Sequence, residues 1–118
     1  MPTRIILALM LSLLIFSACA QDEPSPAEDL ASLITKADQG DAVAQHNLGL
    51  KYHTGEGVPQ DDTLAHMWCN LAASNLTGDD RDLAVTNRDQ VAKEMTPEAI
   101  AEAQRLASEW KPKSSPNN

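Results

Sequence analysis

The side chains best suited to chemistry in this chain are three histidines and a cysteine near its middle. His46 and His53 are two helical turns apart, and His66 and Cys69 are one turn apart, so each pair would share one helix face. If two such helices faced each other, the four side chains would suit zinc. No tight ligand motif surrounds them, so we expect polar or half-buried imidazoles, no metal site and no cofactor.

Other patterns of catalytic residues are missing from the sequence. The acidic clusters at 60–62 and 79–82 lack the spacing of a calcium loop and suit helix capping. No serine triad, phosphate-binding glycine loop or dinucleotide fingerprint occurs. Cys69 has no paired base and lies beside Trp68, so we expect a small buried hydrophobe. The sequence therefore predicts that the protein is not an enzyme.

The amino terminus has the pattern of an export signal. Arg4 is followed by an apolar run from Ile5 to Phe16, broken only by Ser12, which is too short to span a bilayer. We predict that 1–18 is a signal peptide. Two processing sites stay open. The run 17–19 resembles a lipoprotein box, which implies lipidation of Cys19, whereas 18–20 is an A-x-A site that would release a soluble chain.

Charge and composition exclude some partners and favour helices. The 118 residues include 17 Asp and Glu against 9 Lys and Arg, a net charge of −8. This charge argues against nucleic acid and against attraction to anionic lipids. Any membrane association would come from a lipid on Cys19. Because aromatic residues are 3% of the chain and alanine and leucine dominate the apolar share, we predict an all-α protein.

The apolar spacing predicts about five helices within a domain at 27–110. A flexible tether at 19–26 precedes this domain, and a disordered tail at 111–118 follows it. The first helix, 27–38, has Leu30, Leu33 and Ile34 on one face and ends before Gly40. Further starts are predicted at Asp41, at Asp61 or Asp62, near Gly78, and at Thr96-Pro97. Apolar positions at 83, 84, 91, 92 and 95 would bury one face of the fourth helix.

Gly49 is an unusual residue for the middle of the second helix. It costs about 1 kcal/mol of helix propensity relative to alanine. The cost makes sense if another helix passes too close for a Cβ atom. Ala65 and Ala72 are small where the next helix should face Leu48 and Gly49. We therefore expect Gly49→Leu to destabilise the fold by more than propensity alone.

The stretch from Gly40 to Ala73 resembles a Sel-one-like repeat, a relative of the tetratricopeptide repeat. The residues that carry the resemblance are Leu48-Gly49, Tyr52, Gly55-x-Gly57-Val58, Trp68 and Ala72-Ala73. Gly40-Asp41 recurs as Gly78-Asp79, which opens a degenerate second unit, and the run 95–107 resembles the carboxy-terminal cap of bacterial members. Cys69 departs from the family, which often has an aromatic residue there. The resemblance implies a short right-handed α-solenoid of antiparallel helix pairs.

The resemblance also implies the kind of function, because such repeats hold other proteins and carry no chemistry of their own. We predict a non-enzymatic protein–protein interaction scaffold in a bacterial cell envelope, periplasmic or anchored by lipid, with a protein or peptide as partner. Partner contacts are expected on the first helix of the pair, at His46, Asn47, Lys51, Tyr52 and His53, although Tyr52 could belong to the core. The alternatives are an accessory to an envelope or cell-wall enzyme and a structural subunit of a larger complex.

Overall fold

Residues 26–114 are described by a computed structural model, and they form five α-helices. These are α2 (Pro26–Asp38), α3 (Ala42–Thr54), α4 (Asp62–Asn75), α5 (Gly78–Ala92) and α6 (Pro97–Glu109). This part of the chain contains no strand, which confirms the all-α prediction for it. The predicted signal peptide, Cys19 and nearly all of the predicted tether lie outside the described residues. Within 26–114, no helix has both the length and the apolar character needed to cross a bilayer.

Capping side chains fix where three of the helices begin. Asp41, Asp61 and Thr96 each accept a hydrogen bond from the backbone amide three residues later, at 2.9, 3.1 and 3.2 Å. Such bonds satisfy amides that have no partner inside the helix. Pro97 then occupies the first turn of α6, where its missing N–H costs nothing. The predicted caps are confirmed, and the cap of α4 is Asp61 rather than Asp62.

Two glycines in the left-handed region end α2 and α3. Gly40 has a φ of 101° and Gly55 has a φ of 74°, and residues with a Cβ atom rarely adopt such values. After Gly40, the Asp41 amide donates to the Lys36 carbonyl at 3.0 Å, and the Gly55 amide donates to the Lys51 carbonyl at 2.8 Å. These bonds satisfy the last carbonyls of each helix and reverse the chain.

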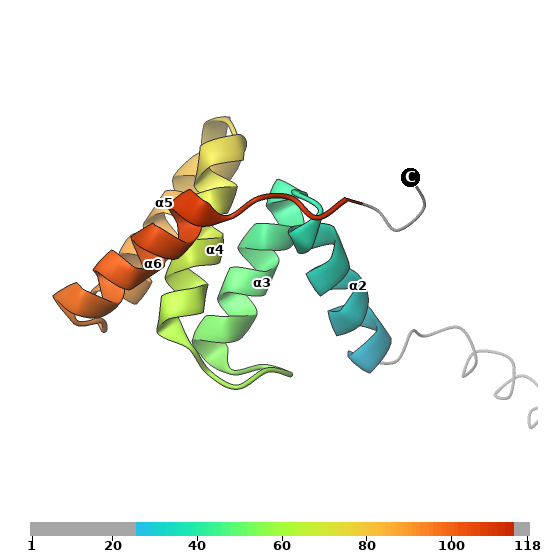
Figure 1. The fold of residues 1–118 in the computed structure, drawn as a ribbon, viewed down its shortest axis with the longest axis horizontal. Helices are drawn as coiled ribbons and strands as arrows, with labels where there is room; N and C mark the ends of the chain where they lie inside the picture. Colours follow the sequence, from blue (N-terminus) through green and yellow to red (C-terminus); the bar gives the residue numbers. More distant parts are fainter. Residues whose placement is uncertain (1–25, 115–118) are drawn as a thin grey trace, which may run out of the picture.

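Helix α4 is the centre of the arrangement (Figure 1). It packs against α3, α5 and α6, whereas α2 packs mainly against α3. The main core lies where α2, α3 and α4 meet, and its buried members are Ala37, Ala44, Leu48, Met67, Trp68 and Leu71. A smaller cluster joins α4 to α5 through Ala72, Ala73 and Ala84. The five helices therefore pack largely in chain order, with α6 returning to α4.

The backbones of α3 and α4 come very close at Gly49. A Cβ atom built on Gly49 would lie 2.7 Å from the Cys69 sulfur and 3.1 Å from the Ala65 carbonyl oxygen. A tightly packed interior has no room for such a contact unless a backbone moves. The close approach expected at this glycine is thus present in the structure.

One face of α5 differs from the expected pattern. Leu83, which we placed among its buried residues, is 52% exposed. The buried positions of α5 are Ala84 and Val91, seven residues apart and so on one side of the helix. The prediction for Leu83 was wrong because a small residue, Ala84, occupies the contact with the alanines of α4.

The segment after α6 also differs from the expected disordered tail. The Lys113 amide donates to the Asp38 carbonyl, and its Nζ donates to the Asp38 carboxylate, both at 2.8 Å. Trp110 packs edge-on against Trp68, with ring centroids 6.1 Å apart and planes at 73°. We call Trp110–Lys113 the C-terminal strap, since it runs from α6 across to the end of α2 (Figure 1).

Candidate interaction surface

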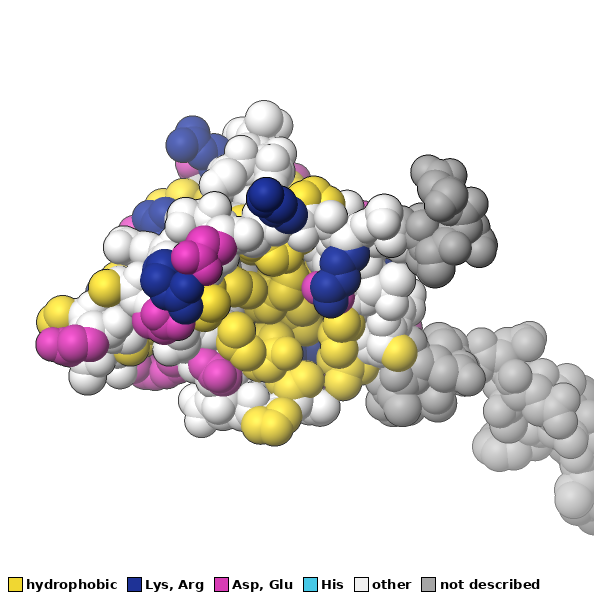
Figure 2. All heavy atoms as spheres, in the orientation of Figure 1, with side chains coloured by type: hydrophobic (Ala, Val, Ile, Leu, Met, Phe, Trp, Pro, Cys, Tyr) yellow, Lys and Arg dark blue, Asp and Glu magenta, His cyan; other side chains and the backbone are white. Residues whose placement is uncertain are grey.

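Hydrophobic side chains gather in a hollow on one face of the molecule, over α3 and α4 and between α6 and α2 (Figure 2). Half-buried apolar side chains that pack on the main core come from these same helices and the strap: Leu30, Leu33, Ile34, Tyr52, Leu64, Leu106, Ala107 and Trp110. We call this set the apolar hollow. It follows from the packing, because α2 packs on α3 and α6 on α4, so both stand beside the central pair.

The apolar hollow has the composition of a binding surface. Contiguous apolar patches on soluble proteins commonly mark interaction sites, and half-buried aromatic residues often dominate the binding energy. Tyr52 and Trp110 are the aromatic members of the hollow. Helix α6 carries a charged cluster in which Arg105 is paired with Glu102 and Glu109, each at 2.6 Å. The hydrogen bond from Arg105 lowers the pKa of Glu102, so this polar cluster stays ionised.

A second, more polar groove separates α2 from α3. Its cavity volume is about 620 Å³, and its lining is Asp29, Ser32, Leu33, Lys36, Asn47, Leu50, Lys51, Thr54 and Glu56. Both acidic and basic side chains line this groove, although apolar atoms make up most of its exposed surface. Leu33 is shared with the apolar hollow, which places the two features next to each other along α2.

The five residues predicted to contact a partner occupy four different environments. Asn47 and Lys51 line the groove between α2 and α3. Tyr52 packs on the main core at the apolar hollow, the core role that the sequence left open. His46 is buried, and His53 is half-buried against Asp62. No histidine shows on the face that carries the hollow in Figure 2. The five residues thus do not form one continuous surface.

Two of the histidines are buried and neutral. Asn87 donates to Nε2 of His46 at 2.8 Å, so the ring carries its hydrogen on Nδ1. Burial lowers the pKa of His46, against an opposing effect of Asp80. Burial also lowers the pKa of His66, helped by Arg88. No partner for the Nδ1 atom of His66 is present among the described residues. Both imidazoles therefore act as interior groups rather than as accessible bases.

Cys69 is fully buried and free, which confirms the small-hydrophobe prediction. Burial raises its pKa to about 11, although the positive charge of Arg88 acts in the opposite direction. The thiol is therefore protonated at neutral pH, and a protonated thiol is a poor nucleophile.

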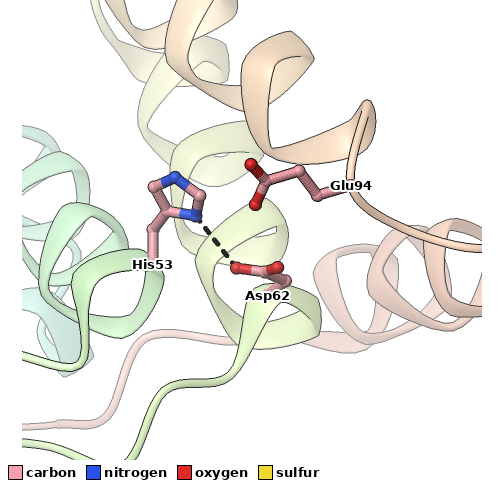
Figure 3. Close-up of side chains that lie close together, drawn as sticks. All are labelled: His53, Asp62 and Glu94. Carbon is pink, nitrogen blue, oxygen red and sulfur yellow. Dashed lines mark hydrogen bonds and ion pairs between the residues drawn. The ribbon is translucent and has the colours of Figure 1, made fainter.

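The four residues that we considered as convergent ligands are not brought together. Among the described residues, the group whose donor atoms all lie within 4.8 Å of one another is His53, Asp62 and Glu94 (Figure 3). Sequence reasoning weighed His53 as a zinc ligand, assigned Asp62 to helix capping and did not single out Glu94. Glu94 is far from His53 along the chain and lies in the turn after α5, so no local spacing marks it.

Comparisons with known proteins supply no relative. No protein-family model, no curated protein and no solved structure matches this chain.

Proposed function

We propose that this protein is a non-enzymatic interaction module that holds a segment of another protein in the apolar hollow. The observation that carries the proposal is the set of half-buried apolar side chains contributed by α2, α3, α4, α6 and the strap. Covering such side chains removes apolar surface from water, which favours binding by about 25 cal/mol per Å² before the costs of association. The hollow therefore offers a partner both area and two aromatic anchors.

The helix arrangement supports a repeat-like scaffold. We propose that α3 and α4 form one Sel-one-like unit, with the close crossing at Gly49 as its packing point. In this view α5 and α6 form the degenerate second unit, although each packs on α4 rather than on the other, and the whole is a short right-handed solenoid. Helix α2 and the C-terminal strap, which meet at Asp38, would then cover apolar surface that the α3–α4 pair leaves open, because a single helical pair cannot bury its own apolar face.

The partner should combine an apolar stripe with basic flanks. An amphipathic helix with apolar residues at i, i+3 and i+4 suits a hollow bounded by two helices. The net charge of −8 favours basic residues on either side of that stripe, since long-range attraction speeds association. The export signal predicted at 1–18 supports an encounter in a bacterial cell envelope, with the protein either free or anchored through a lipid on Cys19.

The buried state of the reactive side chains supports a binding function over catalysis. His46, His66 and Cys69 are the obvious candidates for a base or a nucleophile, and all three are buried. Catalysis needs such groups to reach a bound substrate. Interior packing accounts for them without a reaction.

Site-specific cross-linking in cells tests the proposal. A photo-reactive amino acid placed at Leu30 or Leu106, in the hollow and outside the groove between α2 and α3, should cross-link to one and the same partner. The same probe at Leu83 or Thr86, exposed on α5, should not. Cross-linking to the same products from all four positions would contradict the proposal, as would a lack of products from the two hollow positions.

A matched pair of leucine variants separates binding from folding. Leu30→Glu introduces a charge into the hollow, and Leu83→Glu introduces the same charge at an exposed leucine outside it. We expect Leu30→Glu to weaken capture of the cross-linked partner at least about tenfold, a loss of about 1.4 kcal/mol of binding. Leu83→Glu should leave capture unchanged. Circular dichroism of both variants confirms that they are folded.

A further inference from the structure

Three potential metal ligands from three different elements meet at one end of the α3–α4 pair. His53 lies in the last turn of α3, Asp62 is the first residue of α4, and Glu94 lies in the turn between α5 and α6. One donor atom from each lies within 4.8 Å of the other two. Figure 3 shows the Glu94 carboxylate reaching from its turn toward the hydrogen-bonded pair of His53 and Asp62. This arrangement has no part in the apolar hollow.

Two of the three donors are already held in place. Nδ1 of His53 and Oδ1 of Asp62 are 2.9 Å apart and share a hydrogen. The loop between them is fixed at both ends, because the Gln60 side chain donates to the His53 carbonyl and the Asp61 amide donates to the Tyr52 carbonyl, each at 2.9 Å. Both side chains are half-buried, so their orientations are restricted by packing. Preorganised donors lower the entropy cost of binding an ion.

The Glu94 carboxylate can come as close to the other two donors as a bound ion requires. Ligands about 2.1 Å from a tetrahedral ion are about 3.4 Å apart, somewhat closer than the present limit of 4.8 Å. Glu94 is exposed, so its carboxylate can move inward by rotation about its own bonds. No movement of a helix is needed to complete three ligands, and water can fill the fourth position.

We propose that His53, Asp62 and Glu94 form a binding site for a divalent cation, with Zn²⁺ as the ion that fits best. One neutral imidazole and two carboxylates carry a charge of −2, which a divalent ion balances. A mixed nitrogen and oxygen set without a thiolate is accepted by Zn²⁺, whereas Mg²⁺ and Ca²⁺ prefer oxygen ligands alone. The ion replaces the hydrogen now shared by His53 and Asp62, and that hydrogen moves to the other nitrogen of the His53 ring, which stays neutral.

A bound ion would join three elements that are separate along the chain. His53 and Asp62 belong to the α3–α4 pair, and Glu94 belongs to the turn that leads into α6. The ion would therefore link this turn to the central helices. Because it binds only the folded arrangement, Zn²⁺ should stabilise the protein as a ligand does. This inference goes beyond the interaction function and does not depend on it.

Calorimetry with ZnCl₂ tests the site. The protein is purified as the producing cells process it, freed of metal with EDTA and dialysed before titration. We expect one Zn²⁺ per chain, and a Tm that rises by about 10 °C at roughly a hundredfold excess over Kd. Glu94→Gln should weaken Zn²⁺ binding at least about tenfold, and His53→Ala should abolish it. Glu56→Gln, which removes an exposed carboxylate elsewhere, should bind like the parent.

The variants also define what would overturn the proposal. Glu94 is exposed, so Glu94→Gln should have the parent Tm in EDTA, and any loss of binding in it is not a loss of fold. No saturable heat in the parent, or equal Zn²⁺ affinity in the parent and in both ligand variants, would sink the site. Binding that is lost in His66→Ala but kept in His53→Ala would place the ion elsewhere and also refute it.

Discussion

At Gly49, adding one methyl group would improve the helix propensity of α3 but would worsen its packing against α4. Alanine would gain about 1 kcal/mol of propensity over glycine. However, its Cβ atom would lie 2.7 Å from the Cys69 sulfur, and overpacking of this kind costs about 1–3 kcal/mol. We expect packing to win, so Gly49→Ala should lower the free energy of unfolding and Gly49→Leu should lower it further. Urea unfolding followed by circular dichroism measures both.

The neighbouring cysteine provides the control for this prediction. Cys69→Ala removes the sulfur, the nearest atom, but leaves the Ala65 carbonyl oxygen and the Cys69 amide nitrogen at 3.1 and 3.2 Å. The double variant should therefore recover part of the loss caused by Gly49→Ala, and a double-mutant cycle gives the size of the coupling. A Gly49→Ala protein that is more stable than the parent would show that the helices can separate without cost.

At the residue scale, the sequence predicts the role of a residue only where that role depends on neighbours close along the chain. Gly49 stands out because glycine is costly inside a helix, and Cys69 because it lies in an apolar stripe without a base. The meeting of His53, Asp62 and Glu94 leaves no such trace, since it depends on how the turn after α5 is placed against the α3–α4 loop. Tertiary placement, not residue type, creates that site.

At the scale of the elements, the C-terminal strap is held by an aromatic contact and an ion pair of very different strength. Trp110 is half-buried against Trp68, and aromatic pairs contribute about 0.5–1.5 kcal/mol beyond the area that they bury. The Lys113 side chain is 74% exposed, and exposed ion pairs contribute about 0–1 kcal/mol. Trp110→Ala should therefore lower the free energy of unfolding by about 2 kcal/mol, and Lys113→Ala by less than about 0.5 kcal/mol.

Thermal unfolding followed by circular dichroism distinguishes the two variants. Lys113→Ala is the natural control, because it keeps the backbone hydrogen bond from the amide of residue 113 to the Asp38 carbonyl. If Trp110→Ala melted at the parent temperature, the strap would contribute nothing to the fold. If Lys113→Ala lost as much as Trp110→Ala, the ion pair rather than the indole would hold the strap.

The helix ends show how far sequence reasoning extends at this scale. Asp41, Asp61 and Thr96 cap their helices as predicted, because capping depends on a side chain and an amide three residues apart. The strap was missed because Lys113 and Asp38 are distant in sequence, and the composition of the segment favours disorder. Local chemistry thus predicts helix boundaries, and long-range contacts decide what the connecting segments do.

For the whole molecule, stability should be graded according to how many neighbours each helix has. Helix α4 packs against three other helices and contributes more buried residues than any other described helix. Helix α2 packs mainly on α3, and Ala37 is the one fully buried residue in its described part. Since amides exchange when their segment opens, the amides of α4 should exchange slowest and those of α2 much sooner.

Native-state hydrogen exchange read by mass spectrometry of peptides tests this gradient and links it to the strap. The strap is bonded to Asp38 at the end of α2, so Trp110→Ala should speed exchange in α2 and in α6 while α4 remains protected. Lys113→Ala should change the exchange of α2 much less. If α2 in the parent protein exchanged as slowly as α4, the five helices would open as one cooperative unit. In that case the apolar hollow would be a rigid surface, and α2 would not open before α4.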